Sequence, residues 1–338
     1  QKDMAMNKKQ KFARLIKGEK TDRTLFRPIL MHFAARYHGH TYGEFASDYR
    51  ILVEANMHAL EDFDMDMVGL ISDPYRETAA FGAPVEFVPE AVPRCKAKIV
   101  QSVEDIKQLR NPDVHKAERT LDRIKGAKYY HQVLQGEVPV IGWIEGPLAE
   151  ACDLAGVSEM LMNLMTDPDF SNMLMDKCLI TAKDFALAQL EAGCDIIGMG
   201  DAICSQIDAT TYATHVKPRQ QEIIDFIHDH GGYVKLHICG DITHLLPEIK
   251  DLSVDILDLD WQVDLDEAYQ IMGSETIRCG NINPVDIQNS SVDEIREVSW
   301  KLVEKEKDRK YILSGGCEIT VHTPPNNLKA MREASLKA

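Results

Sequence analysis

The chain has 338 residues, of which 44% are hydrophobic and 27% are charged, and its formal net charge is −16 at pH 7. This composition is typical of a globular protein and excludes a disordered one, and the length suffices for two ordinary domains or one large α/β barrel. The acidic balance leaves no basic surface to neutralise phosphates, so we expect no nucleic-acid partner.

Location and redox state follow from two further patterns. No apolar run approaches the roughly 20 residues of a membrane span, and no secretory leader precedes the first predicted helix, so we expect a cytoplasmic protein without a membrane partner. The cysteines are scattered rather than arranged as a disulfide framework, which predicts reduced thiols. They are Cys95, Cys152, Cys178, Cys194, Cys204, Cys239, Cys279 and Cys317.

The elements alternate between short apolar runs and helical periodicity. Residues 7–19 are predicted as a helix, and residues 1–25 as an N-terminal helical extension of a unit formed by residues 26–338. The predicted strands are 26–33, 65–71, 138–144, 194–200, 235–240, 254–259, 276–281 and 310–313. The predicted helices include 49–63, 149–165, 168–192, 218–230, 242–250, 265–272 and 293–306, and residues 82–100 are predicted as a hairpin excursion. This alternation predicts an α/β protein with a single (β/α)8 TIM barrel, and an open doubly wound sheet is the alternative.

Chemically reactive side chains recur at the predicted strand ends. In a (β/α)8 barrel the carboxyl ends of the strands form the active-site face, so these side chains are expected to meet there. They are Glu145, Asp201, His237, Cys239, Asp258, Asp260, Asn281 and Cys317.

A metal site is the sharpest of these expectations. His237 and Cys239 are two residues apart at the end of an apolar run, and alternating side chains on a strand would point both the same way. Cys317 follows two glycines after the last predicted strand and would be the third ligand. Three protein ligands of this kind suit zinc with one open position. The alternative is a strand-end histidine beside a buried structural cysteine.

The other candidate site residues have weaker signals. Glu145 and Asp201 are candidate catalytic residues that would orient substrate, donate a proton or take the fourth zinc position, with polar caps of strand ends as the alternative. Tyr37 and Asn281 are candidate substrate-binding residues. Tyr37 would line the rim of the barrel, with a solvated loop position as its alternative.

Three segments together carry a resemblance to a known family. They are Gly-Cys-Asp-Ile-Ile-Gly-Met-Gly-Asp at 193–201, Gly-Asn-Ile-Asn-Pro at 280–284, and the run from Gly-Gly-Cys-Glu-Ile-Thr to Lys-Ala-Met at 315–331. With the strand order, they resemble the uroporphyrinogen decarboxylase superfamily over nearly the whole chain. The decarboxylases of that superfamily carry an Arg-Gln-Ala-Gly-Arg loop, whereas this chain has His-Phe-Ala-Ala-Arg-Tyr at 32–37, which retains only Arg36. This departure disfavours binding of a porphyrinogen.

The His-x-Cys and Cys pattern resembles the cobamide-dependent methyltransferase branch. The resemblance implies that His237, Cys239 and Cys317 bind zinc and that a methyl group moves between a small molecule and a corrinoid. The stretch 145–151 resembles members that demethylate methoxylated or methylated compounds, while related members methylate a thiol such as coenzyme M, so the direction stays open. No Asp-x-His-x-x-Gly corrinoid signature occurs, so a separate corrinoid protein is the expected partner. The sequence also leaves a homodimer open.

Two competing functions remain at this point. A metal-free decarboxylase of the same fold would use Asp201 and Arg36 on an acidic macrocycle. A non-catalytic barrel would hold a structural zinc with four protein ligands, and Cys204 or Cys279 would complete that set.

Overall fold

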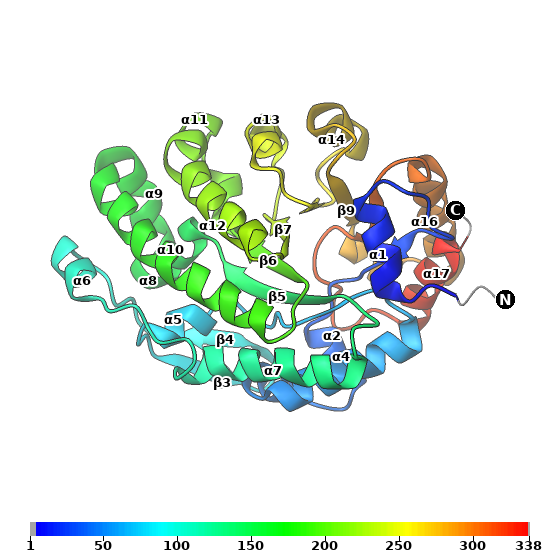
Figure 1. Ribbon diagram of the computed structural model, residues 1–338, viewed down its shortest axis with the longest axis horizontal. Coiled ribbons are helices and arrows are strands. Elements are labelled where there is room, and N and C mark those ends of the chain that lie inside the picture. Colours follow the sequence, from blue (N-terminus) through cyan, green and yellow to red (C-terminus); the bar gives the residue numbers. More distant parts are fainter. Residues whose placement is uncertain (1–4, 337–338) are drawn as a thin grey trace.

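A sheet of eight parallel strands forms the centre of the molecule, and helices lie around it (Figure 1). The computed structural model describes residues 5–336. The strands are β1 (Leu25–Phe26), β2 (Val68–Gly69), β5 (Val140–Glu145), β6 (Ile196–Gly200), β7 (Tyr233–His237), β8 (Ile256–Asp258), β9 (Ile277–Ile282) and β10 (Tyr311–Gly315). Their order in the sheet is β1-β10-β9-β8-β7-β6-β5-β2. They follow one another around the sheet in chain order, as in a (β/α)8 barrel, so the predicted fold class is confirmed and the doubly wound alternative is wrong.

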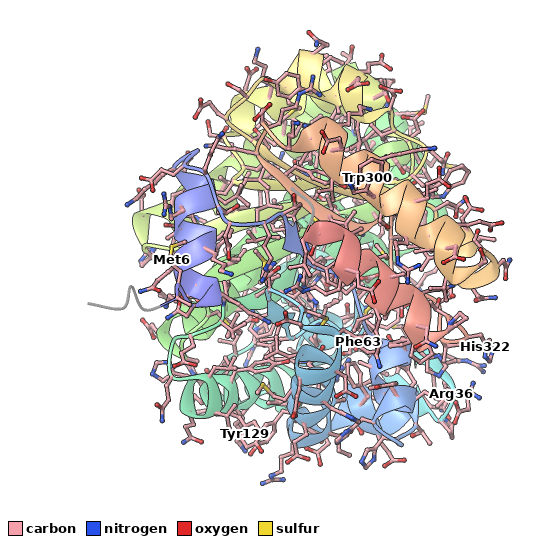
Figure 2. The ribbon with its side chains drawn as sticks, turned by 90° about the vertical axis from the view of Figure 1, so that its right-hand side faces the viewer. Met6, Arg36, Phe63, Tyr129, Trp300 and His322 are labelled. Atoms are coloured by element: carbon pink, nitrogen blue, oxygen red, sulfur yellow. The ribbon has the colours of Figure 1, made fainter. Side chains whose placement is uncertain are left out.

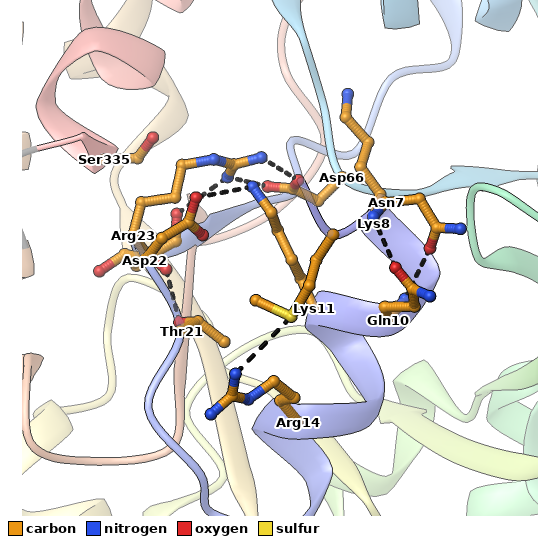
Figure 3. Close-up of polar contacts among 12 residues, drawn as sticks. Asn7, Lys8, Gln10, Lys11, Arg14, Thr21, Asp22, Arg23, Asp66 and Ser335 are labelled. Atoms are coloured by element: carbon orange, nitrogen blue, oxygen red, sulfur yellow. Dashed lines mark hydrogen bonds and ion pairs between the residues drawn. The ribbon is translucent and has the colours of Figure 1, made fainter. Parts of the chain in front are cut away.

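The seam between β1 and β2 is closed by one residue, Asp66. Its backbone N–H donates to the carbonyl of Phe26 over 2.9 Å, and its carboxylate accepts the N–H of Phe26 over 2.6 Å. The same carboxylate binds both terminal nitrogens of Arg23 at 2.7 and 2.5 Å (Figure 3). Arg23 and Asp66 are both buried, so this ion pair ties the first strand to the start of the second.

The helices cover the outside of the sheet. Their bounds are α1 (Lys8–Ile16), α2 (His32–Tyr37), α3 (Tyr42–Ser47), α4 (Tyr49–Phe63), α5 (Arg76–Ala80), α6 (Val103–Gln108), α7 (Glu118–Leu134), α8 (Pro147–Ala155), α9 (Val157–Thr166), α10 (Pro168–Glu191), α11 (Ala209–Thr211), α12 (Lys217–Asp229), α13 (Leu246–Ile249), α14 (Leu265–Met272), α15 (Pro284–Asn289), α16 (Val292–Glu306) and α17 (Pro325–Ser335). The hairpin predicted over 82–100 is confirmed as β3 (Val85–Val88) paired antiparallel with β4 (Ala91–Cys95). Within residues 5–336, no helix combines the length and apolar character needed to cross a membrane.

Some predicted bounds are wrong for local reasons. The first strand stops early because Pro28 has no N–H to continue the ladder, and α2 already begins at His32, within the predicted strand. The helix predicted over 149–165 is divided at Gly156, whose φ of 104° is incompatible with a continuous helix. The fifth strand ends at His237, so Cys239 lies in the loop beyond it.

Helix α1 closes the amino-terminal end of the barrel. Phe12 and Leu15 belong to one buried cluster with inward-facing side chains of the strands, among them Ile196 and Ile256 at the strand starts. The ring of Phe12 meets Tyr233, the first residue of β7, edge-on at 5.4 Å. The opposite end of the barrel therefore carries the strand-end side chains. The division of the chain at residue 25 stays a prediction.

Candidate metal centre

Three of the predicted ligands come together at the carboxyl ends of the strands. Suitable donor atoms of His237, Cys239 and Cys317 all lie within 4.8 Å of one another. His237 is the last residue of β7, Cys239 is two residues later, and Cys317 is two residues after β10. The group therefore joins the loops that follow β7 and β10, two strands that are separated in the sheet by β8 and β9. Cys204 and Cys279 are not members of it, so within residues 5–336 the set has three donors.

The surroundings of His237 leave one ring nitrogen for a metal. Its Nδ1 lies 2.8 Å from Oδ2 of Asp258, while Nε2 lies 3.2 Å from Sγ of Cys239. Lys235 holds the same carboxylate oxygen at 3.2 Å. In the neutral ring, which is the form that binds a metal, a carboxylate that accepts the N–H of Nδ1 fixes the tautomer in which Nε2 carries the lone pair.

The two thiols are electrostatically unequal. The hydrogen bond from Cys239 and the neighbouring His237 ring outweigh burial and hold the pKa of Cys317 well below its usual range, at about 4. The pKa of Cys239 is raised, first because of that hydrogen bond and then because of burial. Burial opposes protonation of His237, but hydrogen bonds to Asp258 and Cys317 raise its pKa to about 9. The group therefore already contains a thiolate, and its one nitrogen and two sulfur donors are those that zinc prefers.

A third loop supports the two that carry the cysteines. Asp260, buried after β8, accepts the N–H of Gly240 over 3.0 Å, next to Cys239. On the other side, Gly316 approaches the backbone of Trp261 so closely that a Cβ would lie 2.4 Å from its nitrogen. Glycine is required beside Cys317 for this reason.

Asn281 holds this supporting loop in place. Its Nδ2 donates to the carbonyl oxygens of Asp260 and Val263 over 3.1 and 2.6 Å. These bonds give Asn281 a positioning role in the structure, and its predicted contact with substrate stays a prediction.

Glu145 lies beside the metal centre in a buried polar network. Its Oε1 accepts from Nε1 of Trp143 and from Nη2 of Arg76, both over 3.2 Å. Its backbone N–H donates to Glu77 over 2.6 Å. Burial raises the pKa of Glu145. The ring of Trp143 packs edge-on against His237 at 5.8 Å, so Glu145 is joined to His237 through one aromatic side chain.

Sequence reasoning missed several members of this network. Arg76 and Glu77 begin α5 shortly after β2, and Glu150 and Asp153 lie on α8. Their position next to Glu145 depends on the pairing of β2 with β5, which no motif records. The only sequence feature that pointed towards this network was the segment 145–151, which contains Glu145 and Glu150.

Asp201 is a buried anchor between two helices. One carboxylate oxygen accepts the N–H of Ala149 in the first turn of α8 over 2.7 Å, and the other accepts from Gln220 of α12 over 2.8 Å. Burial raises its pKa to about 6, although these hydrogen bonds oppose the shift. Both oxygens serve the fold, which favours the alternative of a strand-end cap, and a catalytic role for Asp201 stays a prediction.

We expect the ionisation of Asp201 to destabilise the protein as the pH rises from 4 to 6. In this window the folded state keeps a proton that the unfolded chain, with an ordinary carboxyl pKa, has lost. The contribution of Asp201 to the free energy of unfolding is therefore fully present below pH 4. It falls by about 2–3 kcal/mol as the pH rises to 6. Urea unfolding at several pH values should show a shallower fall in Asp201→Asn than in the native protein. If the free energy of unfolding fell equally in both proteins, the raised pKa of buried Asp201 would not be the cause.

The family model described as uroporphyrinogen decarboxylase (URO-D) matches residues 7–337. The chain belongs to this family. Its relatives have two named activities. It is 25% identical over 332 residues to the uroporphyrinogen decarboxylase of Trichlorobacter lovleyi, covering 93% of this chain and 94% of that one. It is 28% identical over 239 residues to the methylcobamide:CoM methyltransferase MtbA of Methanosarcina mazei, covering 70% and 69%.

The solved structures support the same fold. A methyltransferase from Methanosarcina mazei superposes with a TM-score of 0.89 at 20% identity and covers 98% of both chains. A B12-independent methionine synthase from Shewanella sp. W3-18-1 has a TM-score of 0.57 at 11% identity, over 92% of this chain and 95% of the other. The named relatives in the URO-D family are enzymes, both decarboxylases and methyltransferases.

The one arginine in the segment 32–37 lies at the molecular surface. Arg36 is exposed, and its Nη1 lies 3.3 Å from Nδ1 of His322. Figure 2 shows both side chains at the edge of the molecule. The hydroxyl of Tyr37 donates to Asp62 on α4, and its ring lies 4.9 Å from that of His58. These contacts direct Tyr37 towards α4, and its predicted role in substrate binding stays a prediction.

Proposed function

We propose that this chain is a zinc-dependent methyltransferase that moves a methyl group between a small substrate and a corrinoid carried by a separate protein. The convergence of His237, Cys239 and Cys317 carries this proposal, because one nitrogen and two sulfurs around an open position suit catalytic zinc. The likeness to the methyltransferase MtbA over 70% of the chain supports it.

The protein's own residues would prepare the site. Asp258 orients His237, Asp260 and Gly316 fix the two cysteine loops, and the low pKa of Cys317 supplies a thiolate. Zinc held by these residues would favour the deprotonated form of a thiol in its open position. Glu145 is the acidic residue joined to this site through Trp143, where it would orient the substrate.

We propose that the methyl group moves from the corrinoid to a thiol. Two thiolate ligands donate charge to the metal, which suits it to hold a third, reactive thiolate better than to polarise an ether oxygen. The methyl group would pass from the corrinoid to sulfur, the thiol proton would pass to solvent, and the electron pair of the broken carbon–cobalt bond would stay with the corrinoid. The relative MtbA is named for a reaction with the thiol CoM.

Metal removal tests this function. We expect the purified protein to methylate a thiol from methylcobalamin, to lose this activity after treatment with a zinc chelator, and to regain it with added zinc. The activity would fall at least about 100-fold, since removing even an outer partner of a metal ligand costs 10–100-fold. Full activity without metal, in a protein that remains folded, would contradict the proposal.

Two other functions compete with it. The decarboxylase alternative is supported by relatives such as that of Trichlorobacter lovleyi, which align over 93% of the chain. It is disfavoured because Arg36 is exposed beside His322 and Asp201 has both oxygens engaged. A structural zinc is disfavoured because such sites usually have four protein ligands, whereas the group found within residues 5–336 has three.

A further inference from the structure

A second buried group of charged side chains adjoins the metal centre. It consists of Arg76, Glu77, Glu145, Glu150 and Asp153, and we call it the Arg76 cluster. Arg76, Glu77 and Glu150 are at most 2% exposed, and Glu145 is 6% exposed. The cluster thus has four carboxyl groups and one guanidinium, which pairs with Glu145 and Glu77. Burial raises the pKa of each carboxyl group in the cluster, as expected where negative charges lack cationic partners.

The Arg76 cluster has donors and acceptors that do not satisfy one another. Arg76 binds Glu145 through Nη2, but its Nε and Nη1 have no hydrogen-bond partner. Glu150 accepts from Thr78 through Oε1, while its Oε2 has none. Oδ2 of Asp153 and Oε1 of Glu77 also lack one, although the latter lies 3.4 Å from Arg76. Buried polar atoms are rarely left unpaired, and a ligand with both an anionic and a cationic end would supply partners for the unpaired donors and acceptors of the cluster.

The position of the cluster relates it to the proposed reaction. Trp143 packs against His237 with one edge of its ring and donates its N–H to Glu145. A small molecule with one end at the His237, Cys239 and Cys317 group would therefore meet the Arg76 cluster along Trp143. The face of an indole ring also attracts an ammonium group.

We propose that the Arg76 cluster binds the amino-acid end of the substrate thiol, with the substrate carboxylate on Arg76 and its ammonium among the carboxyl groups. The inference rests on the proposed function, since the thiol end lies at the metal centre. The substrate class is then a small zwitterionic aminothiol. A thiol with only an anionic end, such as a sulfonate, would bind Arg76 but would leave the carboxyl groups without an ammonium partner.

Matched thiols test this assignment. The zinc-loaded protein would be titrated by calorimetry with homocysteine, 2-mercaptoethylamine and 2-mercaptoethanesulfonate, which offer a zwitterionic, a cationic and an anionic end. We expect homocysteine to bind most tightly and the sulfonate at least about tenfold more weakly, the effect of one charged hydrogen bond. If the sulfonate binds as tightly as homocysteine, the inference is overturned.

Variants distinguish the contribution of the Arg76 cluster to thiol binding from that of the metal centre. Glu150→Gln keeps the size of the side chain and should weaken homocysteine binding about tenfold while zinc content and sulfonate binding stay unchanged. Glu159→Gln is the matched control, because Glu159 is exposed and pairs with Lys98 at the surface. Should Glu150→Gln fail to fold, Asp153→Asn takes its place with the same expectation. Unchanged homocysteine binding in the folded variant would overturn the inference, whereas failure of every thiol to bind would overturn the proposed function itself.

Discussion

Replacing Cys239 by serine is expected to reduce the zinc content from about one ion per chain to nearly none. The thiolate is a zinc ligand, whereas a serine hydroxyl stays protonated and is a poor one, so only His237 and Cys317 would remain. Methyl transfer to a thiol should fall at least about 100-fold. Metal analysis of the native and variant proteins, both purified under reducing conditions, measures the first effect directly.

The matched control is Cys95→Ser. Cys95, like Cys239 and Cys317, is a partly buried free thiol, but it lies on the β3–β4 hairpin and belongs to no donor group found within residues 5–336. Its replacement should leave zinc content unchanged. A native protein that folds without zinc would remove the basis of the methyltransferase proposal and favour the decarboxylase alternative.

Replacing Asp66 by alanine is expected to lower the free energy of unfolding by about 3–5 kcal/mol, because it leaves the guanidinium of Arg23 buried without its partner. The same change removes the acceptor for the N–H of Phe26 at the seam between β1 and β2. Urea denaturation followed by circular dichroism at neutral pH would measure the loss.

Asp22→Ala provides the comparison for this change. Asp22 is the exposed partner of Lys11 in the same region (Figure 3), and surface ion pairs contribute about 0–1 kcal/mol. If the two variants lost the same stability, the seam would not depend on the buried pair.

The fold could be predicted because each strand leaves a local signal. Runs such as 194–200 and 254–259 are apolar and end in polar residues, and helical periodicity follows them. The strand bounds were less accurate, since a proline at position 28 and the pairing partner of each strand decide where hydrogen bonding stops.

The three predicted metal ligands do lie together, although the strand geometry that placed one of them was wrong. Alternation along a strand does not place Cys239, because β7 ends at His237. The loop is instead fixed by Asp260, which bonds to Gly240, where φ is 92°. That contact joins residues twenty positions apart, and a sequence pattern does not contain it.

The Arg76 cluster could not be predicted for a related reason. Arg76 and Glu77 are separated from Glu145 by about seventy residues. Only the parallel pairing of β2 with β5 brings the helices that follow these strands together. Side chains that depend on such pairing give no signal at short range.

The seal that α1 makes with Phe12 and Leu15 has a consequence for the order of events in turnover. A barrel closed at one end leaves the other end as the entrance, which the small substrate and the corrinoid protein of the proposed reaction would have to share. The small molecule would then enter before the partner covers the opening, and the methylated product would leave after the partner has dissociated. Steady-state kinetics with both reactants varied should accordingly follow a compulsory sequence, with the corrinoid protein second to arrive and first to depart.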